Sequence, residues 1–558
     1  MADAGLVIGA ISLAFQLFGV CLDAFSLLET AANLGEDGAT FSCMLKLEEH
    51  RLLLWARRSG LTDDNLDPRF NESVIRETLA QLRNLLTNTA NLKSKYKLEI
   101  NPVSNQTDNI PAGEPWGAPL NFLDNQDIVR ERKNIILRAR AAQKASWFPR
   151  RLIWAKKDRQ GFKEMLDTIG QLISKLYDFL DILAIEEIQN ELKLMQLKLI
   201  AMATKIDDIQ LLKEAFSITT AKDSTIETIA FLRILNIDPQ MPGTSENLKP
   251  LKWKSLTDVV DRQPSSSRTI AKYENENVFI EWKPFSIPRS IKIDERVQNL
   301  AVFLQAPKEP TFRSLHCKGV LEDIEHSRYC FLFERPRSLP AQDNISPRSL
   351  FKYLSSSYIP SLTTRFRLAS QLAYTMLHLH CSGWLHKAIR SDNILFFPAE
   401  SDSPLTLDNP YLMGYEYARV DSIGELSEKP SSNPDHDIYR HPLAQGPTSS
   451  SFIKAFDIYS LGIVLYEIAL WRKFGSVMQK IGISSCSPKV MQKVRERLLD
   501  TKSTQGLFND LEFRVGTMYA GVVKSCVGGE FEGTNINPEE FVRLFFENVV
   551  QMLGKCRA

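Results

Sequence analysis

Residues 4–22 read AGLVIGAISLAFQLFGVCL, an uncharged run that Asp3 and Asp23 bracket. As a helix, this run would extend over roughly 28 Å, which is close to the hydrocarbon thickness of a bilayer. It does not resemble a secretory signal, because no Lys or Arg precedes it and no clear small-residue cleavage site follows it. Three interpretations remain: a buried helix of a soluble bundle, a packed helix that inserts into a membrane conditionally, and a permanent membrane anchor.

Polar residues inside the run, Ser12 and Gln16, favour the first two interpretations. A free apolar helix would aggregate in water, so the resting protein must bury this one. If the segment enters a membrane, its large apolar side chains would contact lipid. The candidate membrane residues are therefore Leu6, Val7, Ile8, Ile11, Leu13, Phe15, Leu17 and Phe18.

The first half of the chain has the apolar spacing of helices and no strong alternating strand pattern before residue 215. A stretch rich in Asn, Pro and Gly predicts a loop over 98–126. This half is therefore expected to be an all-α bundle. The predicted helices cover residues 38–58, 73–97, a segment from about 127, and 160–183.

The stretch 185–209 is the most regular of all, because its apolar residues alternate spacings of three and four. This heptad pattern predicts one long helix that packs on its own bundle, or that serves oligomerisation or signal relay. The seam consists of Ile185, Ile188, Leu192, Met195, Leu199, Met202, Ile206 and Ile209.

The charge of the chain indicates which classes of binding partner the sequence supports. Lys+Arg is 68 and Asp+Glu is 67, so the net charge of +1 gives no support for a nucleic-acid partner. Residues 130–160 nevertheless hold eleven Lys or Arg against two acids, with Trp147, Phe148 and Trp154 among them. This segment is either a solvated helix face with buried aromatics or a patch for anionic lipid. The eight cysteines are scattered and contain no C-x-x-C pair, which fits a reducing, cytoplasmic compartment.

Three stretches of the first half resemble fungal HeLo domains, the prion-inhibition and propagation family. They are GLVIGAISLAFQLFGVCLDAF at 5–25, LKLEEHRLLLWARRSGL at 45–61, and WAKKDRQGFKEMLDTIGQLISKLYDFLDIL at 154–183. The resemblance covers about residues 5–215. It implies a helical bundle whose N-terminal apolar segment permeabilises membranes and kills the cell.

The composition changes after a polar and irregular stretch. QPSSSR at 263–268 is a cluster of turn-forming residues. We therefore expect a HeLo-like bundle over 1–215, a linker over 216–265 and a second domain over 266–558. In the second domain, NVFIEWK at 277–283 and YCFLFERP at 329–336 predict buried strands. A long helix is predicted over 365–383, closed by Gly383, which makes this domain α+β.

Two motifs of the second half resemble a protein kinase. LHKAIRSDNIL at 385–395 is similar to the catalytic loop H-R-D-x-x-x-x-N, and FDIYSLGIVLYE at 456–467 is similar to a helix of the C-terminal kinase lobe. The resemblance covers 266–555 and implies a bilobal kinase fold. It makes Lys283 the nucleotide lysine, and it makes Glu295, on a helix over 294–304, the partner of that lysine.

The loop keeps some kinase residues and loses those that carry the chemistry. His386 and Asn393 are kept, and Arg390 preserves a positive charge. The base of a kinase is an Asp, where this chain has Ala388, and the metal-binding Asp falls on Gly414. If the surviving residues have a structural role, we expect His386 to bond the loop backbone, Asn393 to cap the loop and Asp457 to brace it.

Other parts of a kinase are also missing from the sequence. No glycine lies between Gly243 and Gly319, so the phosphate loop ahead of the lysine has none. The A-P-E match at 439–443 places Leu443 at the glutamate. Asp392 and Asp408 are the nearby acids worth testing as substitutes.

The favoured function is therefore a pseudokinase that regulates a membrane-targeting bundle in a signal-responsive cell-death or heterokaryon-incompatibility pathway. Expected partners are further copies of the bundle, anionic membrane lipid and an upstream receptor or kinase, with recruitment from the cytoplasm to the plasma membrane. ATP binding through Lys283 without turnover remains open, and no cofactor or metal is assigned. The alternatives are an active or atypical serine/threonine kinase and a non-catalytic signalling scaffold.

Overall fold

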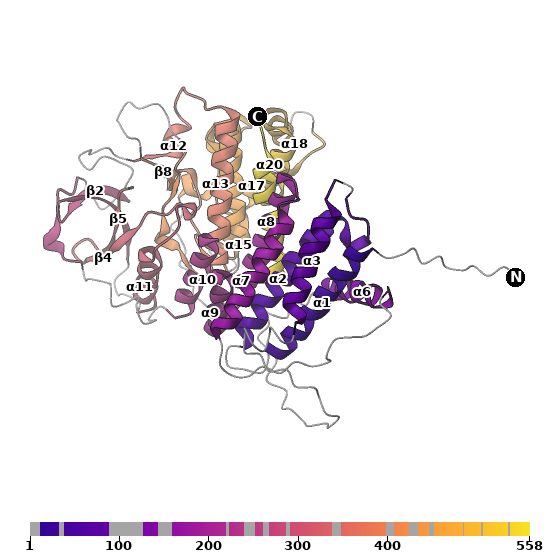
Figure 1. Cartoon of the computed structure of the whole chain (residues 1–558). Helices are drawn as coiled ribbons and strands as arrows, with labels where there is room; N and C mark the ends of the chain where they lie inside the picture. Colours follow the sequence, from indigo (N-terminus) through magenta and orange to yellow (C-terminus); the bar gives the residue numbers. More distant parts are fainter. Residues whose placement is uncertain are drawn as a thin grey trace. The chain divides into compact units, whose positions relative to one another are not determined.

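The computed structural model of the chain contains two compact units, residues 1–230 and 231–558 (Figure 1). Each unit is described by itself. The described residues are 12–32, 38–67, 69–88, 126–142, 159–218, 223–238, 251–260, 267–285, 291–336, 347–397, 407–422, 433–445, 451–483, 485–503, 506–533 and 536–558.

The first unit is helical throughout its described residues, as predicted. Helix α1 packs on α2, α3 and α6, and α2 also packs on α7 and α9. The helices are α1 (Leu13–Ala32), α2 (Gly38–Ser59), α3 (Glu72–Thr87), α6 (Gln126–Ala142), α7 (Arg159–Tyr177), α8 (Ile182–Met202), α9 (Ile206–Ile218) and α10 (Ser224–Ile237), which crosses into the second unit.

The N-terminal apolar run is described only from Ser12 onward. The hydroxyl of Ser12 bonds the carboxylate of Asp64, and Ser12 Oγ accepts the backbone N–H of Phe15 at 3.2 Å, so α1 begins there with its first turn held. Phe15, Leu17 and Phe18 are buried, whereas Leu13 is 51% exposed. The remaining candidates, Leu6, Val7, Ile8 and Ile11, lie outside the described residues. Within the described part of the chain, none of the helices combines the length and apolarity needed to cross a membrane.

The prediction of one helix over 185–209 is wrong. Helix α8 ends at Met202, Ala203 is extended (φ −65°, ψ 125°), and α9 starts at Ile206. The apolar spacing persists across the break because both helices bury seam residues, Leu199 in α8 and Ile209 in α9 among them, while Ile185, Met202 and Ile206 are half-buried. A local signal for the break exists, because Asp207 and Asp208 occupy the first turn of α9, where acids favour a helix start. The buried seam residues therefore pack inside the first unit.

The predicted linker over 216–265 is also wrong, because it contains the whole of α10. Asp223 starts this helix by accepting the backbone N–H of Thr225 at 2.9 Å. Ile226, Ile229 and Leu232 follow at helical spacing and are buried. Near its other end, Asn236 Nδ2 donates to the carbonyl oxygen of Gly383 at 3.0 Å, so this end of the helix is tied to the second unit.

The second unit contains an antiparallel five-stranded sheet in the order β1-β2-β3-β5-β4. Two of its strands confirm the predicted ones, and they pair with each other in the register Ile280–Leu332. Val278, Ile280 and Leu332 belong to the core of the sheet, and the following helix α11 (Ile291–Gln305) packs on β4. The strands are β1 (Leu256–Thr257), β2 (Arg268–Tyr273), β3 (Glu276–Pro284), β4 (Cys317–Asp323) and β5 (Arg328–Glu334).

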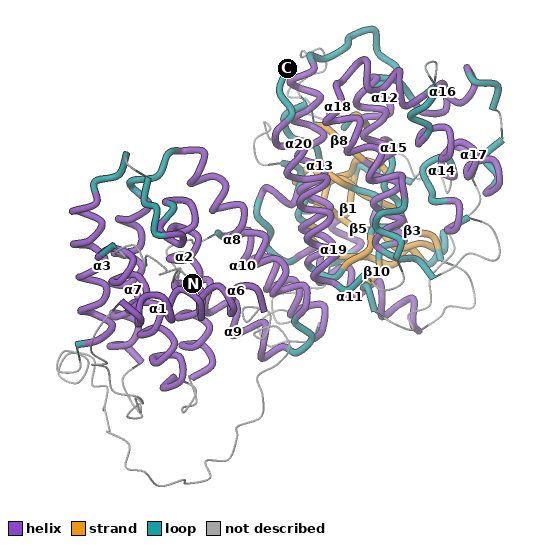
Figure 2. Tube along the Cα trace, turned by 90° about the vertical axis from the view of Figure 1, so that its right-hand side faces the viewer, coloured by secondary structure: helices purple, strands orange, loops and turns teal. Residues whose placement is uncertain are grey.

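The rest of the second unit is mainly helical and confirms its mixed helix and sheet content (Figure 2). The predicted helix over 365–383 is α13 (Leu362–Cys381), and Gly383 follows it with a positive φ of 80°. Helix α13 packs on α15 (Lys454–Leu470), which is buried along its length and packs on α18 (Leu507–Gly528). Short elements carry the candidate site: α12 (Leu350–Tyr353), β7 (Trp384–Leu385), η4 (Ser391–Asn393), β8 (Ile394–Phe396), β9 (Tyr411–Leu412) and η5 (Tyr415–Tyr417).

Candidate functional site

The candidate site is the loop 386–393 together with the residues of β2, β3 and η5 that contact it. The loop leaves β7 with Lys387 in the left-handed region (φ 67°), which a non-glycine residue adopts only when it is held there. Asp457 holds it, because its two carboxylate oxygens accept the backbone N–H groups of His386 and Lys387 at 2.8 Å each. Asp457 thus braces the loop, which is the structural role expected for it.

His386 has a structural position. Its Nδ1 atom accepts the backbone N–H of Ala388 at 3.3 Å, and its ring packs 4.7 Å from the ring of Tyr415. Burial lowers the pKa of His386 to about 4, so the imidazole is neutral at physiological pH. Ala388 itself is buried and offers only a methyl group where a base would be needed.

Asn393 uses both ends of its amide inside the protein. Its Nδ2 atom donates to the carbonyl oxygen of Ala388 at 2.7 Å, which closes the loop on itself. Its Oδ1 atom accepts a hydrogen bond from the guanidinium of Arg268. An amide oxygen that already accepts a charged donor is a poor ligand for a metal ion, because the guanidinium would repel the metal.

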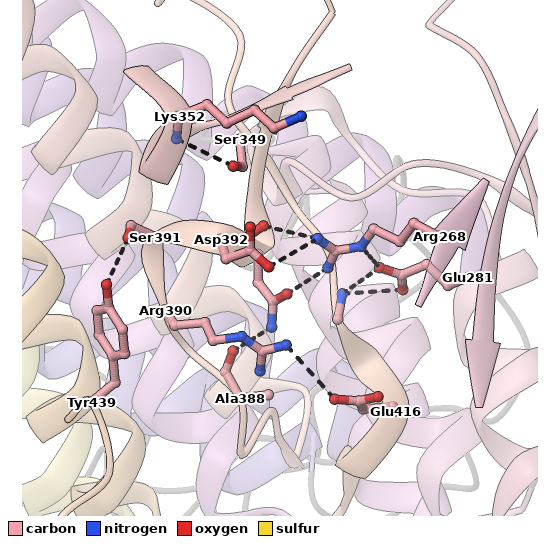
Figure 3. Close-up of polar contacts among 12 residues, drawn as sticks. Arg268, Glu281, Ser349, Lys352, Ala388, Arg390, Ser391, Asp392, Glu416 and Tyr439 are labelled. Atoms are coloured by element: carbon pink, nitrogen blue, oxygen red, sulfur yellow. Dashed lines mark hydrogen bonds and ion pairs between the residues drawn. The ribbon is translucent and has the colours of Figure 1, made fainter. Parts of the chain in front are cut away.

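Arg268 is the residue that joins the sheet to the loop (Figure 3). From β2, its Nε atom donates to Glu281 at 2.7 Å, and Nη1 donates to the backbone carbonyl oxygen of Asp392 at 2.8 Å. With the bond to Asn393, all three guanidinium nitrogens are engaged. No local pattern marks this residue as functional, because it lies in the polar cluster at 263–268 and its partners other than Glu281 are more than a hundred positions away.

Glu281 and Gly414 form the next layer of the site. The carboxylate oxygens of Glu281 accept the backbone N–H of Gly414 at 2.9 and 3.1 Å. Gly414 has a φ of 86°, and an ideal Cβ at this position would lie 2.1 Å from Nδ2 of Asn393. A side chain at 414 would therefore be strained and would collide with Asn393, so this position has no room for an aspartate.

Lys283 does not pair with Glu295 as predicted. The buried amine of Lys283 donates to the backbone carbonyl oxygen of Glu416, and it lies 5.6 Å from the ring of Tyr417. Glu295 is exposed on α11. The neighbouring residue of that helix, Asp294, is turned toward the sheet and accepts a hydrogen bond from the hydroxyl of Tyr329, so the rotation of α11 directs Glu295 away from it.

Arg390 and Glu416 complete the ionic network. The two side chains lie 3.8 Å apart, and both are largely buried. Burial lowers the pKa of Arg390 and raises the pKa of Glu416, because each charged form loses hydration. Burial of this kind is tolerated when the charges are paired, so these residues depend on each other.

The two candidate substitute acids do not form a metal site. Asp392 lies beside Arg268, with 3.9 Å between its carboxylate and the guanidinium. Asp408 pairs with Arg367 of α13 at 3.1 Å and is more than half exposed. Among the described residues, no three His, Cys, Asp or Glu side chains gather in a way that would hold a metal ion.

Two cavities border this network of polar contacts. Beside Lys283 and Gly414 the cavity measures about 20 Å³, which is too small for a phosphate group. A wider cavity of about 590 Å³ lies on the other side of Arg268, lined by Ile270, Phe279, Lys352 and Leu395 among others. A nucleotide with its metal therefore does not fit the residues present, because the lysine, the amide and the space that would hold its phosphates are already used.

The segment 439–443 is held by polar contacts of Tyr439 and His441, and Leu443 is 57% exposed. The backbone N–H of Leu443 donates to Nδ1 of His441 at 3.2 Å. Tyr439 bridges the loop and α15, since its hydroxyl bonds Ser391 Oγ at 2.8 Å and Glu467 at 2.9 Å. His441 contacts Arg495 at 2.9 Å and Glu532 at 3.0 Å.

Two family models match separate parts of the chain. A family model described as prion-inhibition and propagation (HeLo) matches residues 5–214. A second model, described as a domain of unknown function (DUF7580), matches residues 294–555. No curated protein matches the chain. The first unit thus contains a HeLo domain, as predicted, and this match indicates a protein of the fungal cell-death or incompatibility type.

Proposed function

We propose that this is a signal-responsive cell-death or heterokaryon-incompatibility protein, in which a non-catalytic, kinase-like C-terminal unit controls a membrane-targeting HeLo bundle. The observation that carries the non-catalytic part is the bridge from Arg268 to Glu281, Asp392 and Asn393. The match of residues 5–214 to the HeLo model supports the cell-death part.

The chemistry of phosphoryl transfer argues against catalysis. A kinase needs a carboxylate to accept the hydroxyl proton and metal ions to neutralise the phosphates. Ala388 accepts no proton, and Gly414 lies where a side chain would strike Asn393. The guanidinium of Arg268 puts a positive charge on the Asn393 oxygen, where a kinase holds a metal ion. Three separate features of this one site thus oppose the same reaction.

A unit without catalysis acts by binding, and it changes the bundle by favouring one of two states. The trigger in this proposal is an upstream receptor or kinase that binds or modifies the C-terminal unit in the cytoplasm. The released bundle then self-associates and binds anionic lipid at the plasma membrane. Neither nucleic acid nor ATP turnover has a role in this scheme.

Expression in a host cell tests the control of the bundle. Residues 1–230, the first compact unit, are expected to reduce viability, and the full chain is expected to leave it unchanged without a signal. The matched control is Leu13→Glu in residues 1–230, because Leu13 is half-exposed and its replacement spares the core. Equal killing by the full chain would show that the second unit does not restrain the bundle. Harmless residues 1–230 would remove the cell-death assignment.

A turnover assay tests the absence of catalysis. The full chain is incubated with MgATP and a general acceptor protein, and no phosphate transfer above background is expected. The decisive comparison is Lys283→Ala against Lys272→Ala, since Lys272 lies on the neighbouring strand and is exposed. Magnesium-dependent transfer that is lost in Lys283→Ala and kept in Lys272→Ala would establish an active kinase instead.

A further inference from the structure

Helix α6 covers the N-terminal helix α1 with few fully buried apolar side chains. Among its described side chains, Ile135 and Ala139 are buried, Ile128, Val129 and Ile136 are half-buried, and Leu137 is 52% exposed. The other helices around α1 differ, because α2 and α3 each bury several large side chains. Polar contacts therefore carry a large share of what holds α6 in place.

Four arginine contacts connect α6 to the rest of the bundle. They join it to α1, to α2 and to the short turn that follows α2. They are Arg140 to Asp23 at 2.6 and 2.8 Å, Arg57 to Glu131, Arg132 to Glu49 at 3.0 Å, and Arg138 to the carbonyl oxygen of Thr62 at 3.1 Å.

The surface of α1 beneath α6 is formed by Phe15, Gly19 and Asp23, which follow one another at intervals of one helical turn. Gly19 allows the close approach, because an ideal Cβ there would lie 2.2 Å from Cβ of Ala139. The guanidinium of Arg138 lies 4.5 Å from the ring centre of Phe15. Removing α6 would thus expose an aromatic side chain and bare backbone of the apolar N-terminal helix.

Two of these four contacts are of the kind that a charged surface weakens, whereas Arg132 and Glu49 are only 21% and 6% exposed in their pair. Arg140 is 61% exposed in its pair with Asp23, and Arg57 and Glu131 are about one-third exposed. Exposed ion pairs contribute up to about 1 kcal/mol each and are screened by salt. The same helix carries Arg130 and Lys133, which are exposed and form no ion pair with another described residue. They leave α6 with free positive charge for an anionic surface.

We propose that α6 is a releasable cover of α1: an anionic lipid surface competes with Asp23 and Glu131 for the arginines, α6 leaves, and the Phe15–Gly19 face of α1 is exposed. The proposal rests on the membrane targeting proposed above for the bundle. It adds which helix moves, which charges hold it and which surface it uncovers.

Hydrogen exchange of the full chain, followed by mass spectrometry, tests the release. The exchange rate of the α6 peptides is compared with that of the α2 and α3 peptides after each of three additions. These are vesicles with phosphatidylserine, vesicles of phosphatidylcholine alone, and free inorganic phosphate. We expect exchange in α6 to rise about tenfold with phosphatidylserine vesicles only, which corresponds to the loss of ~1.4 kcal/mol, as for two exposed pairs. An equal rise with free phosphate would show that a phosphate anion alone releases α6, and it would overturn the proposal of a lipid surface.

Charge variants test the contacts themselves. Arg140→Asp is expected to speed α6 exchange without vesicles, and Arg140→Asp combined with Asp23→Arg is expected to restore it. The control is Arg130→Asp, which makes the same charge change on the same helix without removing an ion pair with a described residue. Unchanged exchange in α2 and α3 shows that each variant folds. Equal effects of Arg140→Asp and Arg130→Asp, or α6 exchanging together with α2 and α3 under every condition, would overturn the proposal.

A wedge variant separates the cover from the membrane activity. Gly19→Ala places a methyl group against Ala139 and is expected to speed α6 exchange while leaving all charges intact. Release of carboxyfluorescein from the same vesicles is recorded in parallel. If α6 opens and the vesicles release no dye, the proposal that α6 covers α1 stands, and the proposed membrane targeting of the bundle is refuted.

Discussion

Replacement of Arg268 by Ala is the most direct perturbation of the candidate site. The side chain is 16% exposed, and its partner Glu281 is 10% exposed, so the pair is mostly withdrawn from water. Removing one partner of a buried pair costs about 3–5 kcal/mol, because the other charge is left uncompensated. Glu281 keeps the backbone N–H of Gly414 as a partner, which places the expected loss at the lower end, about 3 kcal/mol.

The assay is native-state hydrogen exchange of the full chain in low concentrations of urea. Peptides from β3 and β5 report on the sheet, and α2 of the first unit serves as an internal reference. Lys272→Ala is the matched control on the same strand, because its pair with Asp258 is exposed and should contribute less than about 1 kcal/mol.

A double-mutant cycle decides whether Arg268 acts through Glu281. The two losses, in Arg268→Ala and in Glu281→Ala, are expected to be non-additive by about 2 kcal/mol, since each variant already breaks the shared contact. If Arg268→Ala costs no more than Lys272→Ala, Arg268 does not stabilise this site. If the two losses simply add, Arg268 does not act through Glu281. Either result would refute a closed site held by the Arg268–Glu281 pair.

Three further predictions concern the same unit. Gly414→Ala should lower the melting temperature in scanning fluorimetry far more than Gly521→Ala, because Asn393 blocks a Cβ at 414 and nothing lies within 4 Å of one at 521; equal shifts would contradict this. Asp457→Ala should cost about 3 kcal/mol and speed exchange at residues 386 and 387, since it removes the acceptor of two buried N–H groups. Burial raises the pKa of Glu467 from 4.5 to about 7, so the folded form keeps its proton longer than the unfolded form. Stability should therefore fall between pH 4.5 and pH 7 by on the order of 3 kcal/mol, and Glu467→Gln should remove this fall in melting curves; an unchanged slope would exclude Glu467 as its source.

The sequence by itself determined the helical first unit and several of the larger elements of the second. Apolar spacing is a local property, and it predicted α2, α6, β3, β5 and α13 because each buries one face or both. It also determined that position 388 has no carboxylate, since a missing functional group needs no structure to be recognised. The HeLo resemblance, carried by short stretches of that same helical pattern, agrees with the family match over residues 5–214.

Only the tertiary structure decided how the site is closed. The contact between Arg268 and Asn393 spans 125 positions, so no local pattern reveals it. The rotation of α11, which presents Asp294 and turns away Glu295, depends on packing against the sheet and not on the spacing along the helix. The break between α8 and α9 is invisible to periodicity because both helices bury the same seam. In each case the deciding energy comes from side chains that meet after folding, and the sequence order does not record which of them will meet.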